Sequence, residues 1–223
     1  LSWAGCLLSV AGLLGAVALY VFCKIPEEAH AEEGAPPSMK LNATQGWVVL
    51  IFCLYITGEV LNSMWFVTYL VNAKSMSIGL SSRYLSAFFV CMAFTRALCF
   101  ISLKESQENR LLYFCLIASM GFMVLGHCGF LWAFSLSGVL GPFFPLFLGR
   151  VSRVFHRQSK ALTLWILGMG YVTLGIFHLT VGKLAMKLGI ETAYRLPALL
   201  ILLSVICYGV YLRKERVYLG GLH

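Results

Sequence analysis

The chain contains little charge. Charged residues make up 12% of its 223 positions, with nine acidic residues, whereas a soluble domain averages about 25%. The hydrophobic share is 60% and the mean hydropathy is +0.84, which excludes an ordinary soluble domain. The apolar runs are as long as membrane helices and far exceed the roughly 9–11 residues of a barrel strand. We therefore predict an all-α integral membrane protein.

The motifs of common enzyme and metal sites are also missing. No hydrolase nucleophile elbow, P-loop or dinucleotide-binding fingerprint occurs. Gly168-Met169-Gly170 lacks the third glycine of the dinucleotide-binding fingerprint. The eight cysteines form no CxxC pair and no Cys/His spacing, which argues against a metal centre or a disulfide framework. We expect no enzymatic activity and no cofactor.

Seven apolar segments are long enough to cross a bilayer. The turn between the fourth and fifth is placed at Gly126-His127-Cys128-Gly129, because glycine permits a tight turn. Residues 25–44 form a polar linker. The predicted transmembrane segments are 2–23, 46–71, 82–103, 109–127, 129–149, 161–182 and 192–212.

The basic residues predict an orientation. With a cytoplasmic C-terminus and an outside N-terminus, most of them fall on the inner side, as the positive-inside rule requires. The net charge of +8 then reflects membrane topology, and no nucleic-acid partner is expected. The expected location is the plasma membrane or a bacterial inner membrane. The basic stretch 150–160 is expected to hold its loop inside and to contact lipid, without a fixed salt bridge to the linker.

A polar row inside the second segment is the strongest functional signal. It consists of Tyr55, Glu59, Asn62, Phe66 and Tyr69, spaced by four, three, four and three residues, so the row lies on one face of a helix. A carboxylate such as Glu59 costs roughly 2.5–3.5 kcal/mol to insert in a membrane, so it normally faces a bundle interior or an aqueous path. The row indicates transport or signalling.

A second signal is the pattern Gly138-x2-Gly141-Pro142-x2-Pro145, followed by Gly149-Arg150. The prolines should kink this segment, which membrane helices tolerate where neighbours satisfy the freed carbonyls. We expect Phe134 and Gly138 to share a concave face with the polar row.

Two further polar residues lie inside predicted segments. Arg96 is a candidate for gating or coupling, with a structural partner or an anionic substrate as alternatives. His178 is a candidate for proton coupling, or alternatively makes a hydrogen bond between helices.

The spacing Tyr55-x3-Glu59-x5-Trp65-x3-Tyr69, with the glycine and proline pattern after it, resembles the C-terminal half of a major facilitator superfamily transporter. The resemblance is to the fucose-permease-like sugar symporter group. The chain departs from the family pattern in several places. Gly58 directly precedes Glu59, whereas the family's glycine lies two residues before its glutamate, and Asn62 replaces a small residue. The sixth segment has Gly175 and His178 where the family often has a proline, and the loop 104–110 only faintly matches the family's basic loop.

The resemblance implies a domain organisation. Residues 1–24 would be the last helix of an N-terminal lobe, 25–45 a cytoplasmic linker between lobes, 46–212 a six-helix C-terminal lobe and 213–223 a cytoplasmic tail. The lobe should consist of two three-helix repeats of inverted orientation. The chain would then be a fragment whose partners are the missing N-terminal lobe, the lipid bilayer and a small-molecule solute.

The implied function is secondary active transport of a small polar solute such as a sugar. Transport would proceed by alternating access and be coupled to protons. The expected substrate-binding residues are Tyr55, Glu59, Asn62, Phe66, Phe134 and Gly138, with Arg96 and His178 for gating or coupling. The alternative is a complete seven-helix receptor or light-driven protein. Segment 192–212 has no lysine for a retinal Schiff base. The acidic-Arg-Tyr triplet and the Asn-Pro-x-x-Tyr motif of rhodopsin-type receptors are also missing. A membrane scaffold is a third alternative.

Overall fold

The computed structural model describes residues 41–102 and 107–220, and these form helices and turns without a strand. Six helical segments in this part of the chain are long and apolar enough to cross a membrane. Each overlaps one of the six predicted segments from 46–71 onward. The predicted segment 2–23, and with it the count of seven, lies outside the described residues, as does the linker up to residue 40.

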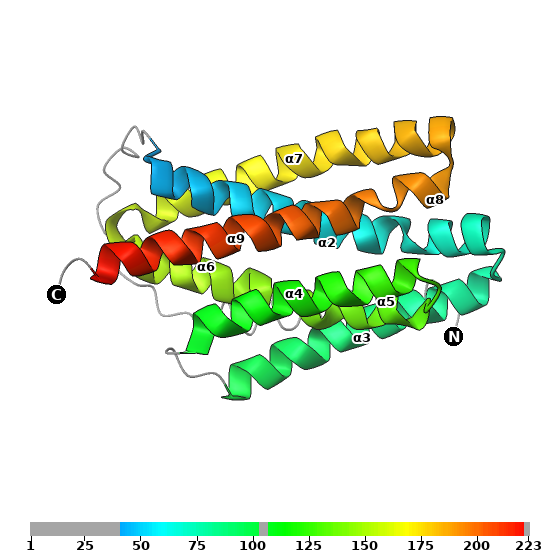
Figure 1. The fold of residues 1–223 in the computed structure, drawn as a ribbon, viewed down its shortest axis with the longest axis horizontal. Coiled ribbons are helices and arrows are strands. Elements are labelled where there is room, and N and C mark those ends of the chain that lie inside the picture. Colours follow the sequence, from blue (N-terminus) through cyan, green and yellow to red (C-terminus); the bar gives the residue numbers. More distant parts are fainter. Residues whose placement is uncertain (1–40, 103–106, 221–223) are drawn as a thin grey trace, which may run out of the picture. The chain divides into compact units, whose positions relative to one another are not determined.

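Each of four of the six spans is a single α-helix (Figure 1). They are α2 (Ala43–Lys74), α3 (Ile78–Ser102), α4 (Glu108–His127) and α7 (Ser159–Leu188).

The other two spans are interrupted. One consists of α5 (Trp132–Leu136), the 3₁₀ segment η2 (Ser137–Leu140) and α6 (Phe143–Val154), and the short η3 (His156–Gln158) leads on to α7. The last consists of α8 (Ile190–Ala193) and α9 (Leu196–Gly220).

Local sequence sets the ends of two helices. Asn42 caps α2, since its side chain accepts from the Gln45 N–H at 2.9 Å while the Gln45 side chain accepts from the Asn42 N–H at 3.0 Å. The turn after α4 passes through Gly129 at φ +109°, a backbone conformation that side chains rarely adopt. This turn lies where the glycine pair predicts it.

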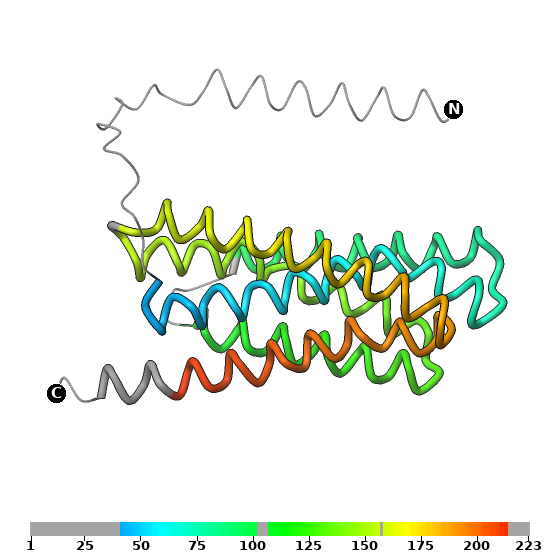
Figure 2. The backbone as a smooth tube through the Cα atoms, turned by 90° about the horizontal axis from the view of Figure 1, so that it is seen from above, coloured from blue at the N-terminus to red at the C-terminus, as the bar shows by residue number. Residues whose placement is uncertain are grey.

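The helix α2 is the centre of the lobe, with α7 and α9 packed on either side of it (Figures 1 and 2). In its most apolar window 61% of the residues are buried, against 11% in α3 and 17% in α7. The helices α3 and α7 are about as apolar as α2 but less buried, so they present large apolar surfaces outward.

The contacts between helices have the pattern that two inverted repeats require. If the first three spans are exchanged with the last three, each contact should have a counterpart. The counterpart of the α2–α7 contact is α3–α5, that of α2–α9 is α4–α6, and that of α2–α3 is α6–α7. All six contacts are observed. The contact between α4 and α9 maps onto itself. Because each repeat has three spans, the second runs opposite to the first, an arrangement common in secondary transporters.

Candidate functional site

The candidate site lies where α2 and α3 meet the span made of α5, η2 and α6, hereafter the interrupted span. The break between α5 and α6 precedes Pro142 and Pro145, neither of which has an N–H. In a continuous helix their N–H groups would bond to the carbonyls four residues earlier, those of Gly138 and Gly141. These two carbonyls therefore need other donors.

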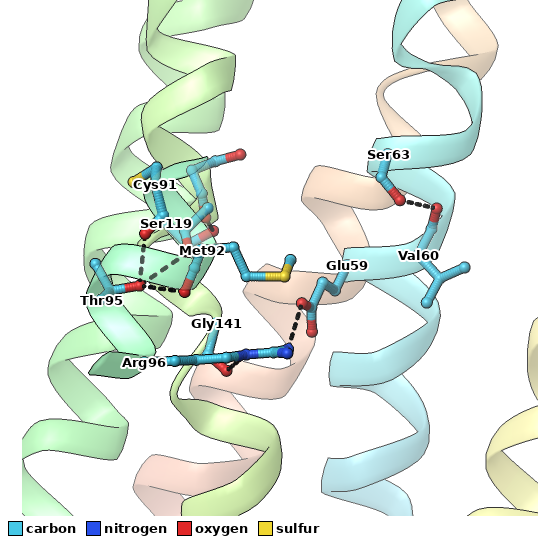
Figure 3. A network of polar contacts seen from close by, with 11 residues as sticks. Glu59, Val60, Ser63, Cys91, Met92, Thr95, Arg96, Ser119 and Gly141 are labelled. Carbon is cyan, nitrogen blue, oxygen red and sulfur yellow. Dashed lines mark hydrogen bonds and ion pairs between the residues drawn. The ribbon is translucent and has the colours of Figure 1, made fainter. Parts of the chain in front are cut away.

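The Gly138 carbonyl oxygen accepts from the Gly141 N–H at 2.9 Å, within its own span. The Thr95 hydroxyl of the neighbouring helix α3 lies farther from the same oxygen, at 3.4 Å. For the Gly141 carbonyl, α3 supplies the donor, since Arg96 Nε donates to that oxygen at 2.8 Å (Figure 3). A guanidinium donor to a carbonyl is among the stronger hydrogen bonds. Arg96 thus fixes the position of the break.

Glycine lets α3 approach this closely. A Cβ atom on Gly141 would lie 2.7 Å from the Met92 carbonyl oxygen, and one on Gly138 would collide with the Phe88 carbonyl oxygen. Both obstacles are backbone, which cannot move aside without displacing α3. The two glycines of the predicted pattern therefore serve the contact between α3 and the break.

Arg96 also reaches toward α2. Its Nη2 lies 3.9 Å from Glu59 Oε1, longer than the 2.7–2.9 Å of a charge-assisted hydrogen bond. The Glu59 side chain is 6% exposed, whereas the Arg96 side chain is 45% exposed. One arginine therefore bridges a carbonyl of the interrupted span and a buried carboxylate of the central helix (Figure 3).

Hydrogen-bonding capacity is left unused beside this bridge. Among the described residues, Glu59 Oε2 and the Tyr55 hydroxyl are buried without a hydrogen bond. The two lie one helical turn apart on α2 and interact with each other, although outside hydrogen-bonding geometry. A buried polar group without a partner costs about 1–3 kcal/mol, so such groups need an explanation.

Asn62, three residues after Glu59, in contrast has hydrogen bonds at both its side-chain nitrogen and its side-chain oxygen. Its side chain donates to the Ser137 hydroxyl at 3.2 Å and accepts from the Tyr194 hydroxyl at 2.7 Å. It thereby joins α2 to η2 and to the turn before α9, and it is almost fully buried.

Phe66 and Phe134 are fully buried in an aromatic cluster. Their ring centroids are 5.6 Å apart, and both rings pack on Tyr194. Gly138, also buried, follows Ser137 directly. The structure thus brings seven of the predicted residues together around the break: Glu59, Tyr55, Arg96, Asn62, Phe134, Gly138 and, behind them, Phe66.

His178 lies apart from this group. Its Nδ1 accepts a hydrogen bond of 3.2 Å from the Trp65 indole N–H, which links α7 to α2. This is the structural alternative considered for His178. Its role in coupling stays a prediction.

Three contacts were missed by the sequence analysis. Thr95 and Tyr194 bond to residues 43 and 132 positions away, and no local pattern connects them. Within the basic stretch, Arg153 pairs with Glu108, a buried carboxylate in the first turn of α4. The composition of that stretch predicted only topology and lipid contact.

Comparison with known proteins supports the fold. No protein-family model matches the sequence, and no curated protein does. Among solved structures, the chain is similar to the crystal structure of the major facilitator superfamily transporter FucP in the outward conformation. The TM-score is 0.64 and the identity 19%, over 76% of this chain and 42% of that chain.

The chain therefore spans less than half the length of FucP, and its fold is that of one half of such a transporter, in agreement with the predicted C-terminal half. With six apolar helices in the described part of the chain, it is an integral membrane protein.

Proposed function

We propose that this chain is the second lobe of a secondary active transporter, which moves a small polar solute across the membrane by alternating access. The observation that carries the proposal is Arg96, which holds the interrupted span through Gly141 and also faces the buried Glu59. Discontinuous helices at the interface of inverted repeats are where secondary transporters bind substrate and coupling ions.

The chemistry of the bridge suits a hydroxylated solute such as a sugar. A hydroxyl group can donate to Glu59 Oε2, which lacks a donor, and can accept from the half-exposed Arg96. Tyr55 would then be the second contact on α2. Asn62, Phe66, Phe134 and Gly138 form the wall behind, and a solute reaches them only if the lobe rearranges.

The same geometry supports the proposal of proton coupling. A charged Glu59 attracts Arg96, and a protonated Glu59 leaves Arg96 to the Gly141 carbonyl alone. The charge on one side chain of α2 thus biases the position of the interrupted span, a two-state element of the kind that switching requires.

The proposal includes a first lobe, reached through residues 25–45, and a cytoplasmic C-terminus in a plasma or bacterial inner membrane. A solute would be held between the lobes near the bilayer midplane. The outward apolar surfaces of α3 and α7 are available for the first lobe and for lipid.

The test is uptake by the full-length protein, with both lobes, in lipid vesicles. Radiolabelled hexoses and deoxyhexoses are offered with and without a pH gradient, and protein-free vesicles serve as the control. The account predicts saturable uptake of at least one sugar that is faster with the gradient. Equal counts in protein-free and protein-containing vesicles for every sugar would reject a sugar transporter.

A further inference from the structure

A groove between α4 and α9 lies away from the proposed transport site. It has a volume of about 420 Å³ and is lined by Tyr113, Ile206, Gly209, Val210, Leu212 and Arg213. Gly209 keeps it open, because a Cβ atom there would lie 3.2 Å from the Tyr113 hydroxyl.

One end of the groove is basic and polar. Arg213 is the last residue of the candidate span Ile190–Arg213, and Tyr113 lies in the second turn of α4. Arg110 is three residues before Tyr113, hence on the same face of α4, and is exposed. No ion pair joins Arg110 or Arg213 to a carboxylate among the side chains described, and Glu108 is paired with Arg153.

The rest of the groove is apolar and lies at membrane depth. Ile206 and Val210 continue from Arg213 toward the middle of the span and are exposed. A small soluble anion would contact only the basic end and leave these side chains uncovered.

We propose that this groove binds one anionic phospholipid. The phosphate would lie at Arg213 and Arg110, with the Tyr113 hydroxyl as a third donor, and one acyl chain would run along Ile206 and Val210. Arginine matches phosphate geometry through paired N–H donors, and tyrosine suits the boundary between headgroup and hydrocarbon. The site does not depend on transport.

The test is native mass spectrometry of the full-length protein, purified in mixed micelles with equal amounts of phosphatidylglycerol and phosphatidylcholine. The wild type should retain one phosphatidylglycerol in preference to phosphatidylcholine. The double variant Arg110→Gln/Arg213→Gln should bind it more than tenfold more weakly, since each basic residue near the surface contributes about fivefold. The matched control Lys187→Gln, an exposed basic residue in the last turn of α7, should bind as the wild type does.

A second variant separates the groove from its charge. Gly209→Leu fills the groove and keeps both arginines, so it should also lose the retained lipid. If the double variant retains phosphatidylglycerol like the wild type, or if Lys187→Gln loses it equally, the site is refuted. If Gly209→Leu does not fold, the double variant and its control still decide the question.

Discussion

The buried polar residues of α2 fall into two kinds. Asn62 has its hydrogen bonds made by Ser137 and Tyr194, whereas Glu59 Oε2 and the Tyr55 hydroxyl have none within the described residues. A satisfied buried group fixes packing, and an unsatisfied one marks a place where stability was given up for function. We therefore expect substitutions at the two kinds of position to have different effects.

Replacement of Asn62 by leucine should lower stability. The change removes the 2.7 Å acceptor of the buried Tyr194 hydroxyl and leaves it only the carbonyl of residue 62, at 3.3 Å, which costs about 1–3 kcal/mol. Thermal unfolding in detergent measures the loss. In a double-mutant cycle, Tyr194→Phe should cost much less in the Asn62→Leu background than alone, and simple additivity would contradict the hydrogen bond.

At this scale the sequence predicted part of the site. The spacing of four and three residues placed Tyr55, Glu59 and Asn62 on one buried face, because helical periodicity is local information. Their partners were out of reach, since Ser137 and Tyr194 lie 75 and 132 positions from Asn62. Only the packing of the spans brings them together.

Among the elements, the interrupted span is the one on which the site depends. The prolines predicted a kink, and the structure has the irregular stretch just before them, in Ser137–Leu140 and the turn that follows. The reason is that a proline removes the hydrogen bond to the residue four positions earlier. The replacement donor for the Gly141 carbonyl comes from α3, which the proline pattern alone could not indicate.

Removing the replacement donor should destabilise the lobe in a way that a proline substitution repairs. Arg96→Leu leaves the Gly141 carbonyl without its guanidinium donor, at a cost of about 1.5–3 kcal/mol. Pro145→Ala restores an N–H four residues after Gly141, so the double variant should recover much of the loss. Thermal unfolding in detergent tests this.

The matched control for that experiment is Arg83→Leu, which removes an exposed arginine from the first turns of the same helix. It should change stability by less than about 0.5 kcal/mol. If Pro145→Ala gives Arg96→Leu no recovery, Arg96 does not replace the missing donor.

Glycine substitutions test the approach of α3 to the interrupted span. Gly141→Ala places a Cβ atom 2.7 Å from a backbone oxygen of α3 and should cost at least about 1–3 kcal/mol. Gly175→Ala on α7 has open space around the new Cβ, so it should be neutral or stabilising by up to about 1 kcal/mol. Equal melting temperatures for the two variants would contradict the close contact.

The sequence predicted which segments are helices and did not predict which one is central. Length and hydropathy located all six spans, because these are properties of each segment alone. The helices α2, α3 and α7 are similarly apolar, yet only α2 is mostly buried. Burial depends on how the spans pair, which composition does not contain.

For the whole molecule, the inverted repeats place the interrupted span and α2 in equivalent positions. They are the first spans of the two repeats, and each packs against the second span of the other repeat. Arg96 and Glu59 belong to the first repeat, and Arg96 connects it to the second through the Gly141 carbonyl. A change in the interaction between Arg96 and Glu59 would therefore be felt by both repeats, as a rocking lobe requires.

The most direct test of this account is the effect of Glu59→Gln on transport by the full-length protein in lipid vesicles. Glutamine keeps the shape of the side chain and cannot exchange a proton or attract Arg96 as a charge. The account predicts that accumulation driven by a pH gradient falls at least tenfold, whereas Glu191→Gln, which removes an exposed partner of Lys74 at the end of α2, transports as the wild type does. Unchanged uptake with unchanged pH dependence in Glu59→Gln would contradict the account and leave Glu59 a structural residue.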